Sequence, residues 1–411
     1  MVPAEPGRAA SPVLTRQGAD HCHPQLRDAI LASPALQERL GAHFDPALFD
    51  AELRAIAAEL GLEPDRPSTG ASGTNALDGS QGASVTLDTW PQIGWLPVRA
   101  VPGAAAPAFD WAWFGSDTLR EPSFEASVRR MVSRPISLRF RTRTGLTALI
   151  AGAGREATLA PDGIVFHMSR CGSTLVAQML AALPHHIVAS EAAPIDVMAQ
   201  WCTTSGAPPE LQVAALRAIV AAIGRNRSGT SRRYFLKLDS WAILALPLFR
   251  AAFPNTPWIF LYRQPEEVMV SHLRMPGMHF AAGQVPALSA LDAGHNGAIE
   301  ERGAAVLAQY LDCAVEQMSL GGGMLVNYSE LPIAMEDRIP RHFGFMPDAD
   351  ERAAMAAASR RDSKAPGLAF VDDRQRKRAA VTPAIAGAVA RYLEEPYARI
   401  EALRVGAATA V

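Results

Sequence analysis

The chain has 411 residues and a formal net charge of −2 at pH 7, which excludes a global electrostatic attraction to nucleic acid or to anionic membranes. Any basic site must therefore be local. Its length suffices for one large domain with an accessory region. The four cysteines have neither metal-finger nor C-x-x-C spacing, so we expect a reduced, cytoplasmic protein without a metal, nucleic-acid or membrane partner.

The N-terminal part divides by composition. Residues 1–23 are rich in Pro, Ala and Gly and have no apolar core, so we expect a disordered tail without a signal peptide. Residues 24–64 carry apolar side chains at helical spacing, with Asp45 or Pro46 opening a second helix, which predicts a small helical unit. Residues 65–85 are rich in Gly and Ser, as is typical of a flexible linker.

The remaining chain predicts two further regions. Residues 86–160 are aromatic-rich, and we expect short strands and one helix that pack as an accessory region on the main domain. From 161 to 411, apolar runs alternate with helix-period segments, which predicts a three-layer α/β fold with a central parallel sheet. The strand runs are "GIVFHM", "HHIVAS", "RYFLKLD", "PWIFLYR" and "GGMLVNYS". Polar residues at their carboxyl ends, including Tyr328, should converge on one edge.

The first of these strands leads into a turn that resembles a phosphate-binding loop. A glycine lets the backbone approach closely, and the start of the next helix offers N–H donors to an anion. The lysine of nucleotide-hydrolase loops is missing, and the nearest cation precedes the glycine. An ordinary strand-to-helix turn is the alternative. The candidate residues are Ser169, Arg170, Cys171, Gly172, Ser173 and Thr174.

A second candidate anion site follows the strand "PWIFLYR". Arg263 ends this strand, and Ser271 lies eight residues later in the following helix. An arginine can form a bidentate contact with a phosphate, and a serine on the inward helix face supplies a second donor. The alternative is that Arg263 pairs with Glu266 or Glu267 while Ser271 faces solvent.

Three segments together resemble the sulfotransferases, and most nearly bacterial sulfotransferase-like proteins. "HMSRCGSTL" resembles the family's 5′-phosphosulfate loop, and "FLYRQPEEVMVSH" resembles its 3′-phosphate motif. "FLKLDSW" stands where the cytosolic members carry a Lys-Thr-His segment. The resemblance covers about residues 163–396. It implies a P-loop-like fold that uses 3′-phosphoadenosine 5′-phosphosulfate (PAPS), without a metal.

The resemblance also implies roles for single residues. Arg170 would replace the family's loop lysine, Lys237 would contact the leaving group, and Lys364 would be a late ligand of the 3′-phosphate. Two carboxylates are candidates for the general base. Glu191 resembles the base of Golgi-type relatives and is favoured, and Asp239 stands at the position of the cytosolic family's histidine. The alternatives are that Asp239 caps a helix and that Glu191 only pairs with Arg170.

The sequence therefore predicts transfer of a sulfuryl group from PAPS to a hydroxyl or amine of a small-molecule or peptide acceptor. A nucleotide-dependent kinase on the same fold is a second interpretation. It lacks support because the loop lysine and a strand-end aspartate for magnesium are both absent. A non-catalytic nucleotide- or peptide-binding protein is the third.

Overall fold

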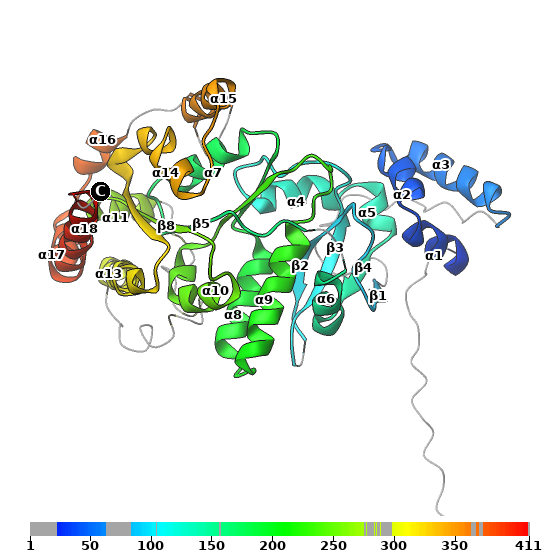
Figure 1. Ribbon diagram of the computed structural model, residues 1–411, viewed down its shortest axis with the longest axis horizontal. Helices are drawn as coiled ribbons and strands as arrows, with labels where there is room; N and C mark the ends of the chain where they lie inside the picture. The colour runs from blue at the N-terminus through cyan, green and yellow to red at the C-terminus, as the bar shows by residue number, and fades with distance from the viewer. Residues whose placement is uncertain are drawn as a thin grey trace, which may run out of the picture.

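The computed structural model describes residues 23–62, 84–103, 105–155, 158–274, 277, 283, 285, 288, 298–362, 367–369 and 373–409. Two sheets lie side by side, with a small group of helices at the N-terminal end (Figure 1). The tail and the linker predicted for 1–23 and 65–85 lie almost wholly outside the described residues.

A five-stranded parallel sheet forms the centre of the larger half. Its strand order is β6-β7-β5-β8-β9. The three inner strands are buried along almost their whole length, as parallel strands covered on both faces must be. The α/β class and all five predicted strands are confirmed. The strands are β5 (Gly163–His167), β6 (His186–Ser190), β7 (Arg233–Lys237), β8 (Trp258–Tyr262) and β9 (Gly323–Asn327).

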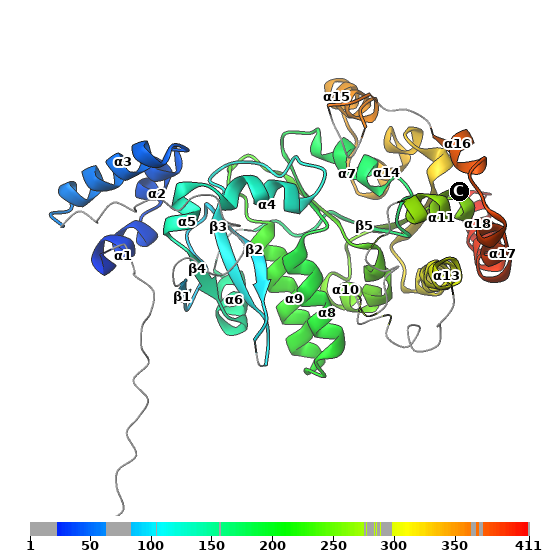
Figure 2. The same ribbon diagram turned by 180° about the vertical axis from the view of Figure 1, so that it is seen from behind.

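Helices cover both faces of this sheet. One face is covered by α7 (Ser173–Ala181), with α15 (Ala349–Ser359) packed against it. The other carries η1 (Ser240–Ala245), which contacts β5, together with α10 (Leu246–Ala252) and α13 (Ile299–Gln317). Both views show α10 and α13 on this side (Figures 1 and 2). The remaining helices of this half are α8 (Ala193–Thr204), α9 (Pro209–Ile223), α11 (Pro265–Arg274), α14 (Arg338–His342), α16 (Arg374–Arg378), α17 (Pro383–Tyr392) and α18 (Glu394–Thr409).

The aromatic-rich region folds as a second sheet, of order β1-β4-β3-β2. Its strands are β1 (Val85–Leu87), β2 (Trp95–Val101), β3 (Ala108–Trp113) and β4 (Thr142–Thr144). It carries three helices, not the single one expected: α4 (Phe124–Val132), α5 (Pro135–Arg139) and α6 (Leu146–Ala153). The added helices are short, and only two residues separate the end of α4 from Pro135, where α5 begins. Such short helices give little periodic signal.

A buried arginine joins the two sheets. Arg225 follows α9 and is fully buried, and its guanidinium donates to the carbonyl oxygens of Trp95 at 3.0 Å and Pro91 at 2.9 Å. The guanidinium also lies 5.5 Å from the ring centroid of Trp90. These contacts bind the aromatic region to the end of α9, which itself packs on α8.

The N-terminal unit is helical as predicted, with three helices where the pattern indicated two. They are α1 (Pro24–Ala32), α2 (Pro34–Gly41) and α3 (Pro46–Glu59). The chain breaks at Ser33 because a residue before proline disfavours the helical backbone, and Ser33 then caps α2 through Leu36 N–H. Asp45 caps α3, at the predicted opening.

Candidate functional site

The turn between β5 and α7 follows a left-handed backbone. The φ angle is 73° at Ser169, 50° at Arg170 and 87° at Gly172. Residues other than glycine rarely adopt positive φ, and such strain clusters at functional sites. Gly172 is the N-cap of the nine-residue helix α7 and has no side chain to accept from its first N–H groups. These donors are therefore available to an anion.

The side chains of this loop divide into inward and partly exposed ones. Cys171 is fully buried, and its Sγ lies 3.1 Å from the carbonyl oxygen of Leu261 on β8. Burial raises the pKa of Cys171 to about 12, so the side chain stays a thiol. Ser173 is buried at the helix start, and Thr174 is half-buried beside it.

An aromatic ring ties this loop to the end of β8. A Cβ placed on Gly172 would lie 2.7 Å from Cδ2 of Tyr328 and 3.0 Å from Cδ1 of Leu331. The Arg263 guanidinium lies over the same Tyr328 ring, 4.0 Å from its centroid. The backbone N–H of Arg263 in turn contacts Met168 Sδ at 3.2 Å. The two candidate anion sites are thus neighbours.

Arg263 is buried and paired, as the alternative interpretation of its sequence motif held. Its Nε donates to Glu267 Oε2 at 2.6 Å, and Nη2 lies 2.5 Å from the same oxygen and 3.6 Å from Asp373 Oδ1. Glu267 is 2% exposed and also accepts from Arg378 Nε at 3.2 Å. Nη2 of Arg263 forms no well-aligned hydrogen bond with the described residues. A guanidinium has five N–H donors, so this pairing leaves capacity for another anion.

Two further cations reach this end of the sheet from α16, and the sequence did not single them out. Lys377 is buried, and its Nζ lies 3.1 Å from Asp373 Oδ2. Arg378 contacts Glu267, the residue of α11 that also pairs with Arg263. Burial lowers the pKa of Lys377. The run "RQRKR" was the available signal. Ser271 is half-buried on α11, and Lys364 lies outside the described residues, so its role stays a prediction.

Lys237 and Glu191 form an ion pair at the carboxyl ends of β7 and β6. Lys237 Nζ contacts Glu191 Oε1, and His167 Nε2 lies 3.6 Å from the same oxygen. Burial alone would raise the pKa of Glu191. The charge of Lys237 and its hydrogen bond to Glu191 outweigh this and hold that pKa well below its usual range. The alternative to a base role for Glu191 was a pairing with Arg170, and the ion pair observed here is with Lys237.

His167 supports the loop from below and was missed in the sequence, where it reads as the last residue of a strand. Its Nδ1 accepts the N–H of Ser169 at 3.0 Å, and Nε2 lies 2.9 Å from the carbonyl oxygen of Leu238. Nε2 must therefore carry the proton. Burial lowers the pKa of His167, which fits a neutral ring. The neutral imidazole holds Ser169 in its left-handed conformation.

Asp239 caps the helical turn η1, as the structural alternative proposed. Its Oδ1 accepts the backbone N–H of Ser240 at 2.6 Å and lies 3.2 Å from the Ser240 hydroxyl. A carboxylate in this position stabilises the start of η1.

A narrow cleft opens beside Asp239, between the ends of β6 and β7 and helix α8. Asp196, on α8, was not singled out in the sequence, although "VASEAAPID" ends on it. Its carboxylate accepts from Trp241 Nε1 at 2.5 Å and from Gln200 Nε2 at 2.7 Å. Burial and the nearby charge of Asp239 raise the pKa of Asp196 to about 6. The lining residues are Glu191, Ala192, Ile195, Asp196, Ala199, Leu238, Asp239, Trp241, Ala242 and Phe249.

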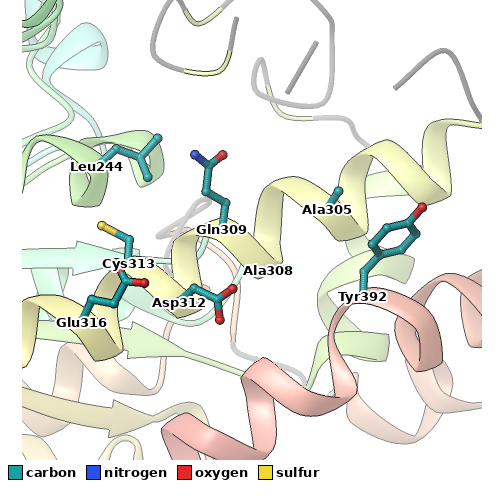
Figure 3. Close-up of a pocket in the computed structure, with 8 residues that line it drawn as sticks. All are labelled: Leu244, Ala305, Ala308, Gln309, Asp312, Cys313, Glu316 and Tyr392. Carbon is teal, nitrogen blue, oxygen red and sulfur yellow. The ribbon is translucent and has the colours of Figure 1, made fainter. Parts of the chain in front are cut away.

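An open groove of about 630 Å³ lies elsewhere, between η1, α13 and α17 (Figure 3). Gln309 and Leu244 face one another across it, and Tyr392 borders it from the neighbouring helix. No residue of the β5–α7 loop lines this groove, so it is separate from the strand-end site. Its lining residues are Leu244, Ala305, Ala308, Gln309, Asp312, Cys313, Glu316 and Tyr392.

Two kinds of feature are absent from the described residues. No group of three or more His, Cys, Asp or Glu side chains there is arranged to hold a metal ion. None of the helices within the described ranges combines the length and the apolar character needed to cross a membrane.

No family model and no curated protein matches the sequence. Among solved structures, the chain is similar to sulfotransferase STF1 of Mycobacterium tuberculosis, with 16% identity and a TM-score of 0.36 over 51% of this chain and 76% of that one. It is also similar to the sulfotransferase domain of the Synechococcus PCC 7002 olefin synthase, with 14% identity and a TM-score of 0.38 over 60% and 96%. For the sulfotransferase domain of the curacin biosynthetic pathway, the identity is 15% and the TM-score is 0.38, over 60% of this chain and 98% of that one. The function proposed below rests on the geometry of the site.

Proposed function

We propose that this protein is a sulfotransferase that moves a sulfuryl group from PAPS to a hydroxyl or amine of a small-molecule or peptide acceptor. The observation that supports the proposal is the left-handed loop after β5 and buried Arg263 after β8, which both contact the ring of Tyr328. A donor with a phosphosulfate at one end and a 3′-phosphate at the other requires two such sites. The left-handed loop fits the first group, and buried Arg263 fits the second.

The proposed roles follow from position. The N–H groups of the loop and of the α7 start would hold the phosphosulfate, with the hydroxyls of Ser173 and Thr174 beside them. Arg170 and Lys237 would stabilise the negative charge that develops on the departing phosphate oxygen. Arg263 and Ser271 would contact the 3′-phosphate. Because a transferring sulfuryl group carries less negative charge than a phosphoryl group, no magnesium ion is needed in this scheme.

Isothermal titration with adenosine 3′,5′-bisphosphate and with ADP tests the proposal. We expect the bisphosphate to bind more tightly, because ADP lacks the 3′-phosphate that Arg263 would bind. The variant Arg263→Gln keeps an amide donor for buried Glu267 and removes the charge. Loss of a charge-assisted contact of about 2–3 kcal/mol corresponds to a Kd increase of about 30- to 140-fold for the bisphosphate.

Arg233→Gln is the matched control. Arg233 begins β7, at the amino ends of the strands and so at the opposite end from Arg263, and its guanidinium pairs with Asp162 at 3.2 Å and lies over the Phe345 ring. We expect this variant to bind the bisphosphate as the wild type does. Equal affinity of the wild type for ADP and the bisphosphate would favour the kinase interpretation. An unchanged Kd in Arg263→Gln would remove Arg263 from the site.

A further inference from the structure

We infer that Asp196 is the general base that takes the acceptor's proton, and that Glu191 instead positions Lys237. This inference rests on the proposed sulfotransferase function. Its starting point is the narrow cleft at the ends of β6 and β7, which reaches the Lys237–Glu191 pair and is lined by three carboxylates: Glu191, Asp196 and Asp239. Only one of them needs to be a base, and their partners differ.

Two of the three carboxylates are committed to other groups. Glu191 is paired with a buried cation, Lys237, and a carboxylate held by a cation is a weak base. Asp239 uses Oδ1 as the cap of η1. Asp196 has only neutral donors, because no Lys, Arg or His in the described part of the chain forms an ion pair with it.

The two neutral donors orient the Asp196 carboxylate but do not use all of its lone pairs. Trp241 Nε1 donates to Oδ1 and Gln200 Nε2 donates to Oδ2. A carboxylate has about four lone-pair sites, so each oxygen keeps one for a further donor. Gln200 is one turn from Asp196 on α8, and buried Trp241 lies on η1, so both donors stand on regular structure.

The electrostatic environment agrees with this assignment. The charged groups that face Asp196 are Asp239 from η1 and Glu191 from the end of β6, and both repel a second negative charge. Together with burial they raise the pKa of Asp196 to about 6. A general base works best when its pKa lies near the working pH.

The other elements packed against α8 add no cation to this environment in their observed contacts. On α9, the Arg217 guanidinium donates to the carbonyl oxygen of Ala252 at 2.6 Å. On β2, Arg99 pairs with Asp110 at 2.5 Å. Both arginines are therefore directed to groups other than Asp196.

Atoms and charge balance in the transfer step. The acceptor oxygen attacks sulfur while the bond from sulfur to the 5′-phosphate oxygen breaks, and the electron pair leaves on that oxygen. The acceptor's proton passes to the Asp196 carboxylate. The products are the sulfated acceptor, adenosine 3′,5′-bisphosphate and protonated Asp196, which returns its proton to solvent.

The test measures turnover of ³⁵S-labelled PAPS with water as acceptor, which needs no identified substrate, and with 2-naphthol as a probe. Asp196→Asn keeps the size of the side chain and one of its two accepted hydrogen bonds, and it removes the basic carboxylate. We expect its turnover to fall by about 10²- to 10⁴-fold while the Kd for the bisphosphate stays within about twofold of the wild-type value. Asp312→Asn, in the separate groove of Figure 3, is the matched carboxylate control and should turn over PAPS normally.

The pH profile separates Asp196 from Glu191. Wild-type kcat/KM should fall as pH drops through about 6. In Asp196→Asn this acid limb of the profile should be absent, and in Asp196→Glu it should be partly restored. Glu191→Gln should keep the limb. Near-normal turnover in Asp196→Asn, or loss of the limb in Glu191→Gln, would overturn the inference. Failure of the wild type to bind the bisphosphate would instead reject the proposed function itself.

Discussion

The substitution Gly172→Ala tests whether the loop must come this close to Tyr328. At φ 87°, an alanine costs roughly 1–2 kcal/mol because its Cβ crowds the backbone. Its Cβ would also lie 2.7 Å from Cδ2 and 2.9 Å from Cε2 of Tyr328, distances that real Cβ atoms do not keep, so the ring or the loop must move. Overpacking of this kind costs about 1–3 kcal/mol. The two terms together predict a loss of roughly 2–5 kcal/mol in the free energy of unfolding.

The matched control is Gly206→Ala. Gly206 has φ 67°, and no atom lies within 4 Å of the position that an alanine Cβ would take, so only the backbone term of roughly 1–2 kcal/mol applies there. Urea unfolding of both variants gives the difference, and titration with adenosine 3′,5′-bisphosphate reports the loop. We expect Gly172→Ala to lose more stability than Gly206→Ala and to bind the bisphosphate more weakly. Equal losses and unchanged affinity would refute the close approach of Gly172 to Tyr328.

Two further predictions concern metal and pH. Turnover of PAPS should survive excess EDTA, because the loop lacks the lysine and β8 lacks the terminal aspartate that accompany magnesium; a strict magnesium requirement would return attention to the kinase interpretation. The folded-state pKa of Asp196, about 6, lies above its ordinary value of 3.8, so the folded state binds more protons between these values. The wild type should therefore lose up to about 3 kcal/mol of unfolding free energy as pH rises through this window. Asp196→Asn should lack that loss, and parallel pH curves of the two proteins in urea unfolding would contradict it.

The fold and half of the candidate site could be predicted from local sequence. The strands of the large sheet are recognisable because they are buried on both faces and hence read as apolar runs. The loop around Gly172 and the end of β8 at Arg263 carry their polar residues in sequence order. A strand-to-turn pattern locates them without any knowledge of tertiary contacts.

The rest of the site depends on contacts between distant segments. Lys237 meets Glu191 across 46 residues, and Arg378 meets Glu267 across 111. Asp196 shows nothing unusual in its local sequence, because its donors and repelling charges come mainly from η1. Such pairings follow from strand order and helix placement, which a sequence pattern does not encode.

Arg225 determines how this chain can be divided. It belongs to the connection after α9, yet it donates to the carbonyl oxygens of Trp95, which begins β2, and of Pro91, which precedes that strand. Its removal would leave these two buried carbonyl oxygens without that hydrogen bond. If the chain were divided between residues 155 and 158, Arg225 would be on one fragment and its acceptors Trp95 and Pro91 on the other. The indole of Trp90 would also lose its contact with the Arg225 guanidinium. We therefore expect a fragment that holds the parallel sheet without the aromatic region to be less stable than the whole chain.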